Sequence, residues 1–161
     1  MNDNSTLIEA AEAVKDALNN APYGTFGDHT FTAIRVYRPA FTPAQLADLR
    51  VVVLPRAENR SNLARGKWAF APEVQVGVMQ QLTRPADGSD PMLNNDQADG
   101  LMALVATIGD YLGDAAVLRG YRQVGPQLIE NDPAWSVEHM ADTGTFISVL
   151  TLTLGKAKNK R

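Results

Sequence analysis

Apolar residues recur at helical spacing in two segments of the chain. In the first, Thr6 and Glu9 have the spacing of a capping box, so we expect a helix to begin there. Its apolar face consists of Leu7, Ala11, Val14 and Leu18. The second segment covers about 95–113, and its apolar stripe consists of Leu101, Leu104, Val105, Ile108 and Leu112. The spacing therefore predicts two amphipathic helices.

Between and after these helices, the chain has alternating segments or short apolar runs that end at turn residues, as strands do. The expected strands lie near 30–38, at 50–55, at 73–82 and at 145–154, with an interrupted strand within 118–130. Thr42 before Pro43 predicts a single helical turn. The order of these elements predicts a single-domain α+β fold with a mixed, mostly antiparallel sheet and two helices packed on one face.

Residues at about 55–72 connect two of these strands and are expected to form a long basic loop. About seventeen residues without clear structure exceed a normal hairpin link and are typical of a functional or partner-ordered segment. Its cations and aromatic residues, set against Glu58 alone, are Arg56, Arg60, Arg65, Lys67, Trp68 and Phe70. Such a mixture can stack on nucleobases or anchor a protein interface. For Trp68, packing into the core is an equally favoured interpretation.

Length and charge narrow the classes of protein further. The 161 residues suit one domain, expected at 1–155, followed by a basic tail at 156–161. Although the net charge is -3, the cations are concentrated in the loop and the tail, so the rest of the chain is strongly acidic. This distribution favours docking on acidic protein surfaces, including another copy, over general nucleic-acid binding. The tail flanks an uncharged last strand, so it is interpreted as a solubilising extension or a tether to an acidic neighbour.

Catalytic chemistry has little support in the sequence. Cysteine is absent, and the two histidines, His29 and His139, match no zinc spacing and are expected to be solvated loop residues. No phosphate-binding glycine loop or nucleophile elbow is present. We therefore expect no enzyme activity, no cofactor and no metal. A signal peptide and a membrane-spanning segment are not expected either.

Three stretches together resemble a known family. They are VVVLPRAENRSNLARGKWAFAPEVQVGVMQQL, the helix ADGLMALVATIGDYLG, and IENDPAWSVEHMADTGTFISVLTLTL. Over about 30–155 they are similar to the tail terminator and tail completion proteins of long-tailed bacteriophages. The resemblance implies a virion structural protein of the phage neck, assembled in the host cytoplasm. It also implies a ring, expected to be hexameric, that caps the tail tube and joins it to the head connector.

On this interpretation the chain has itself, the tail-tube protein and the head–tail connector as partners, and DNA passes through the lumen without specific binding. The residues expected at the interface are Arg56, Arg60, Arg65, Lys67, Trp68 and Phe70. A nucleic-acid-binding module that uses the same loop and the basic tail is the alternative. A small-ligand protein or enzyme with a pocket between helices and sheet is the least supported hypothesis.

Overall fold

The computed structural model describes residues 5–121 and 128–159, and it confirms the predicted α+β fold. Six strands form one mixed, mostly antiparallel sheet in the order β1-β2-β3-β5-β4, and β6 pairs with β3. The strands are β1 (Ile34–Arg35), β2 (Arg50–Ala64), β3 (Lys67–Gln81), β4 (Leu128–Asn131), β5 (Thr145–Thr153) and β6 (Lys156–Asn159). The helices are α1 (Thr6–Asn19), α2 (Pro43–Leu46), α3 (Asn95–Gly113) and α4 (Val137–Thr143). Short 3-10 turns lie at Pro91–Leu93 and Arg119–Tyr121.

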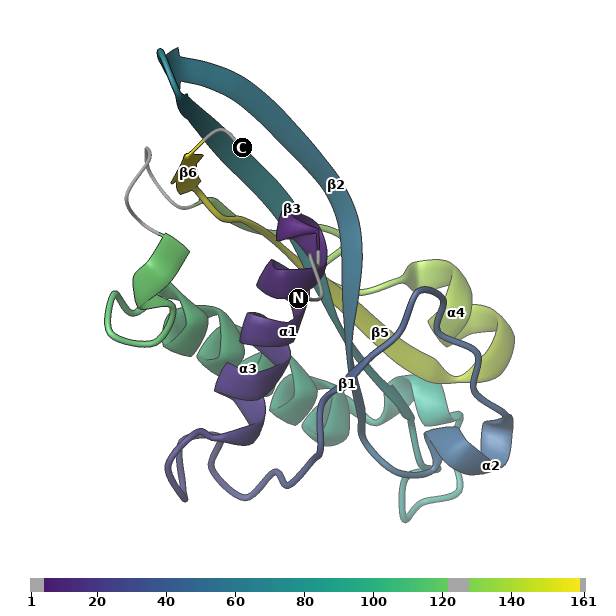
Figure 1. Ribbon diagram of the computed structural model, residues 1–161. Helices are drawn as coiled ribbons and strands as arrows, with labels where there is room; N and C mark the ends of the chain where they lie inside the picture. The colour runs from purple at the N-terminus through teal and green to yellow at the C-terminus, as the bar shows by residue number, and fades with distance from the viewer. Residues whose placement is uncertain (1–4, 122–127, 160–161) are drawn as a thin grey trace.

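The hydrophobic core lies between one face of the sheet and the helices α1 and α3 (Figure 1). The five residues predicted as the apolar stripe of α3 are its buried residues, which confirms that prediction. On the sheet, the core face is formed by alternate residues of three neighbouring strands. They are Val51, Val53, Val74, Val76, Val78, Phe146, Leu150 and Leu152.

The helix starts agree with the sequence in one case and differ in the other. At α2, Thr42 Oγ1 accepts a hydrogen bond from the N–H of Gln45, whose side chain accepts one from the N–H of Thr42. At α1, the capping residue is Ser5 and not Thr6, because Ser5 Oγ accepts from the N–H of Ile8 at 3.1 Å. Thr6 is buried in the first turn of the helix. The hydroxyl of the preceding residue, Ser5, therefore caps the helix in its place.

The expected strand at 30–38 is reduced to the two residues of β1. Its neighbour Ala33 is held by Asn19, whose side chain accepts from the Ala33 N–H at 2.7 Å and donates to its carbonyl at 2.9 Å. The Val36 N–H bonds the Val53 carbonyl of β2, so Ala33, three residues earlier, directs its N–H and C=O away from β2, where the Asn19 side chain bonds them. None of the helices within residues 5–121 and 128–159 combines the length and the apolar composition of a membrane-spanning segment.

The expectation of a long loop at 55–72 is wrong, because these residues belong to the hairpin of β2 and β3. Paired residues continue from Arg50 and Met79 to Ala64 and Lys67, with a two-residue turn at Arg65 and Gly66. Gly66 has φ of 86°, the left-handed conformation that such tight turns require. The sequence hid this hairpin because its outer half is polar on β2 and lacks an apolar alternation.

The expected basic tail is also part of the sheet over its described residues. β5 pairs Thr153 with Glu73, and β6 pairs Lys156 with Phe70, so β6 continues β5 in the same register along β3. The interruption between them lies opposite Pro72, which has no N–H to donate; its carbonyl accepts from the N–H of Leu154 at 2.9 Å.

Gly77 marks a tight approach between two central strands. A Cβ at Gly77 would lie 3.0 Å from Cγ2 of Val52, its fully buried partner on β2. Val52 has a stiff β-branched side chain and its strand is paired on both sides, so it has no room to withdraw. We expect Gly77→Ala to lower the free energy of unfolding by about 1–3 kcal/mol, as overpacking does, measured by urea unfolding.

Gly109→Ala is the matched control for this prediction. It lies within α3, and its Cβ would meet Leu150 Cδ2 at 3.7 Å, an ordinary contact. Removing a helical glycine should raise the free energy of unfolding by about 0.5–1 kcal/mol. A Gly77→Ala variant as stable as the wild type, or more stable, would show that the approach of Val52 to Gly77 does not limit packing.

Candidate interaction surface

The outer half of the β2–β3 hairpin is the most extended feature of the molecule. We call it the distal ribbon: residues 56–64 of β2, residues 67–72 of β3, and β6 beside them. Figure 1 shows that the tip of the hairpin reaches past α1 and α3, away from the core. Residues 61–68 are all exposed. The ribbon therefore carries its side chains where a second molecule can contact them.

A bulge at Arg56 decides which ribbon side chains face the α1 side of the sheet. Pro55 pairs with Val74 and Ala57 with Glu73, so Arg56 is an extra residue without a partner on β3. After it, Glu58 and Arg60 share a face with Phe70. If Arg56 had a partner on β3, the register would shift by one residue. Arg60 would then pair with Ala69 and lie on the face away from the Phe70 ring.

Two of the six expected interface residues are used within the subunit. Phe70 is only 8% exposed, and the Arg60 guanidinium lies 5.2 Å from the centre of its ring. Arg60 Nη2 also lies 3.1 Å from Oε2 of Glu58. The apolar contact expected of Phe70 is therefore made inside the chain, because the bulge directs Arg60 over its ring. Arg60 keeps most of its side chain exposed, so its outer edge still faces solvent.

The other four expected residues lie on exposed positions along the ribbon. Arg56 is at the bulge, Arg65 is in the turn, and Lys67 begins β3. Trp68 is 36% exposed, so it is neither fully buried in the core nor fully solvated. Leu63, 48% exposed beside the turn, is an apolar residue that sequence reasoning missed. Its signal was weak, because a single leucine in a polar segment is common on protein surfaces.

The strand β6 fixes the base of the ribbon to α1 through charged groups. Lys158 Nζ lies 2.6 Å from Oε2 of Glu9 on α1, and Lys156 Nζ lies 4.7 Å from the ring centre of Tyr121. Burial raises the pKa of Tyr121 to about 12, and the Glu9 carboxylate adds to the effect. Lys156 and Lys158 thus meet acidic and aromatic partners of their own subunit, which a freely solvated tail would not.

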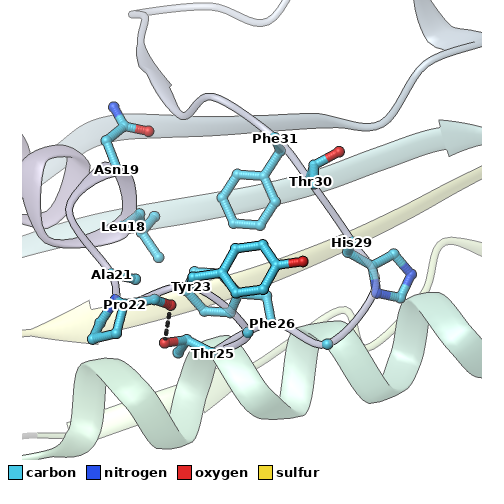
Figure 2. Close-up of a pocket in the computed structure, with 12 residues that line it drawn as sticks. Leu18, Asn19, Ala21, Pro22, Tyr23, Thr25, Phe26, His29, Thr30 and Phe31 are labelled. Atoms are coloured by element: carbon cyan, nitrogen blue, oxygen red, sulfur yellow. Dashed lines mark hydrogen bonds between the residues drawn. The ribbon is translucent and has the colours of Figure 1, made fainter.

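The two histidines do not form an acid–base grouping in the described residues. His29 lines a hollow of about 170 Å³ between the end of α1 and the loop at 21–31 (Figure 2). That loop is held by Phe26, whose ring lies 5.1 Å from Phe31 and edge-on to Tyr111 at 5.5 Å, and by a 2.6 Å bond from Thr25 Oγ1 to the Pro22 carbonyl. The hollow is therefore lined by side chains that shape the loop.

His139 lies on α4, where its Nδ1 is 2.8 Å from Ser136 Oγ. Ser136 is the N-cap of this helix, so its hydroxyl is placed by the helix start. Within residues 5–121 and 128–159, no carboxylate bonds the histidine ring and no group of three acidic or histidine side chains is arranged to hold a metal ion.

No protein-family model matches the chain, and no curated protein matches it.

Proposed function

We propose that the chain is a non-enzymatic structural subunit of a phage neck, whose copies assemble into a ring that caps the tail tube and joins it to the head connector. The observation that supports this proposal is the distal ribbon, which extends from the packed domain and exposes Arg56, Arg65, Lys67 and Trp68. A projecting hairpin with cations and an aromatic residue has the composition of a protein-binding hot spot.

The charge distribution supports contact between copies of the same chain. The ribbon is basic, while the solvent-facing side of α3 carries Asp96, Asp99 and Asp110, with Asp114 directly after it. Two different surfaces of opposite charge on one chain favour a head-to-tail contact, which closes into a ring when the rotation per subunit allows it. The net charge of -3 also suits a lumen through which DNA passes without being gripped.

The experiment that tests the proposal measures assembly directly. Native mass spectrometry and negative-stain imaging of the purified chain, alone and with isolated tail tubes, should reveal rings, expected to be hexameric, or rings seated on tube ends. We expect the double variant Arg56→Glu/Arg65→Glu to keep the circular-dichroism spectrum of the wild type and to lose assembly, because it reverses the charge of the exposed ribbon.

The matched control is Arg38→Glu/Arg119→Glu, which makes the same change of charge at exposed residues outside the ribbon. It should assemble as the wild type does. A chain that stays monomeric, ignores tail tubes and binds oligonucleotides with an affinity that falls steeply with salt would overturn the proposal in favour of a nucleic-acid-binding module.

A further inference from the structure

We propose that the outer edge of β2 in the distal ribbon of one copy pairs with the outer edge of β4 in a second copy, so that the sheet continues from subunit to subunit. This inference rests on the proposed assembly of a ring and names the surfaces that form it. It follows from the positions of the strand edges, their lengths and their charges.

The ribbon leaves one edge of β2 open. β1 pairs with only Val52 and Val53, and the Val36 N–H adds a bond to the Val53 carbonyl. From there to the tip, residues 57–61 are paired with β3 on one side, and no described strand lies on the other. Every second residue of this stretch therefore directs its N–H and C=O outward, where they can bond another strand. The opposite edge of the ribbon is different, since β6 already covers β3 there.

The second open edge belongs to β4, at the other end of the strand order. β4 pairs with β5 through Leu128 to Asn131, and in the part of the chain that the structure describes no strand flanks its other side. Glu130 and Asn131 are exposed. β1, at the opposite end of the sheet, has only two residues and offers too few backbone groups to be an equal partner.

The two edges match in length. Residues 57–61 lie between the bulge at Arg56 and the irregularity near Leu63, and they form a regular stretch of about 17 Å at 3.4 Å per residue. The four residues of β4 need about 14 Å on the same scale. The bulges that end the regular stretch also limit how far a partner strand can slide along it.

Charge selects this pairing over the symmetric ones. The open edge of β2 is flanked by Arg56 and by Arg65 in the turn, and within it Glu58 is paired with Arg60, whereas β4 contains Glu130 and is followed by Asp132. Pairing β2 with β2 of a second copy would bring the arginines together, and pairing β4 with β4 would bring the acids together, and both arrangements are destabilised by like charges. Only the contact between β2 and β4 joins opposite charges. Because it uses two different surfaces, it propagates from copy to copy and suits a ring.

A groove beside β4 adds room for ribbon side chains. It lies between α3 and the sheet edge and is lined by Gly109, Asp110, Gly113, Ile129 and Asn131 with Leu150. The two glycines keep the helix surface low along this groove, and Asp110 places a negative charge at its rim. Arg60 lies on the face of the ribbon that is turned toward α1. The helix α3, and with it this groove, lies on the same face of the sheet.

Hydrogen exchange on the wild-type assembly tests the pairing. In the assembled protein, alternate amides of residues 57–61 and of β4 should exchange about tenfold or more slowly than in the dissociated subunit. Amides of the loop at 21–31 should be unchanged and serve as the internal control. Assembly without slowed exchange at either edge would overturn the inference while leaving the proposed ring intact. A wild-type chain that never assembles would overturn both.

Mixing two charge variants provides the second test. The first variant, Glu130→Lys/Asp132→Lys, makes the β4 edge basic, and the second, Arg56→Glu/Arg65→Glu, makes the β2 edge acidic. Each alone should lose assembly about tenfold or more, because its two edges then carry the same sign. An equimolar mixture should recover assembly, since each edge of one variant then meets its opposite in the other. Recovery supports the heterologous β2–β4 contact, and failure of the mixture, with both variants folded by circular dichroism, contradicts it.

Discussion

Replacing Phe146 with alanine is expected to lower the free energy of unfolding by about 3–5 kcal/mol, the range for a buried aromatic residue. Phe146 is the largest of the fully buried side chains and is 1% exposed. It lies on β5, whose backbone is bonded to β3 on one side, and to the Ser136 N–H through the Ile147 carbonyl on the other. Because the strand is held on both sides, it cannot move inward to fill the cavity, so the cost should stay near the upper part of this range.

Ile147→Ala is the control for Phe146→Ala. Ile147 is the next residue of the same strand, points to the opposite face of the sheet and is only partly buried. Its loss of stability should be less than half that of Phe146→Ala, because less apolar area returns to water. Urea unfolding followed by circular dichroism measures both. Equal losses would mean that the face away from α1 and α3 is packed as tightly as the core face.

Alkaline pH is expected to destabilise the protein through Tyr121. This residue is 6% exposed, and its pKa is raised by burial, and by Glu9, from 10.0 to about 12. The folded state therefore keeps the phenol proton where the unfolded state has lost it. The stabilising contribution of the neutral phenol is fully present below pH 10 and is lost as the pH rises from 10 to 12. At about 1.36 kcal/mol for each unit of pKa, the loss is about 2–3 kcal/mol.

Tyr121→Phe should remove this part of the alkaline sensitivity. The difference in unfolding free energy between the wild type and this variant should shift by about 2–3 kcal/mol against the wild type between pH 9 and pH 12. Every other titratable residue is the same in both proteins, so the difference reports the tyrosine. Tyr23→Phe, at a fully exposed position, is the control and should show no such shift. A constant difference for Tyr121→Phe would show that its phenol ionises without unfolding the chain.

The sequence predicted the parts of the fold where burial follows a strict period. The apolar residues of α3 recur at helical spacing, and β5 places Phe146, Leu150 and Leu152 on one face. Each element could therefore be recognised without its neighbours. The α+β class followed from the order of these elements. The bounds of α3 and β5 were predicted to within about a residue for the same physical reason.

The distal ribbon could not be predicted in this way, because its strands are not covered by helices over their whole length. In such a strand neither face must be apolar, so Arg56 to Ala64 resembles a loop in composition. The one local signal was Gly66 in a two-residue turn. The position of β6 depends on partners far apart in the sequence, Glu9 for Lys158 and Tyr121 for Lys156, and the lysines alone indicated only exposure. Arg60 and Phe70 were expected in one loop, whereas they lie on β2 and β3, and their contact depends on the bulge at Arg56.

The ribbon is also the part of this fold whose size can vary most freely over evolution. Core strands cannot lengthen without displacing α1 or α3, whereas residues added in pairs to both strands near Gly66 would extend the hairpin by about 7 Å per pair and keep every side chain on its face. A single added residue would reverse the faces beyond it. Homologous chains should therefore differ here by even steps, and in the assembly that we propose the length of the hairpin would record the distance that each subunit must span.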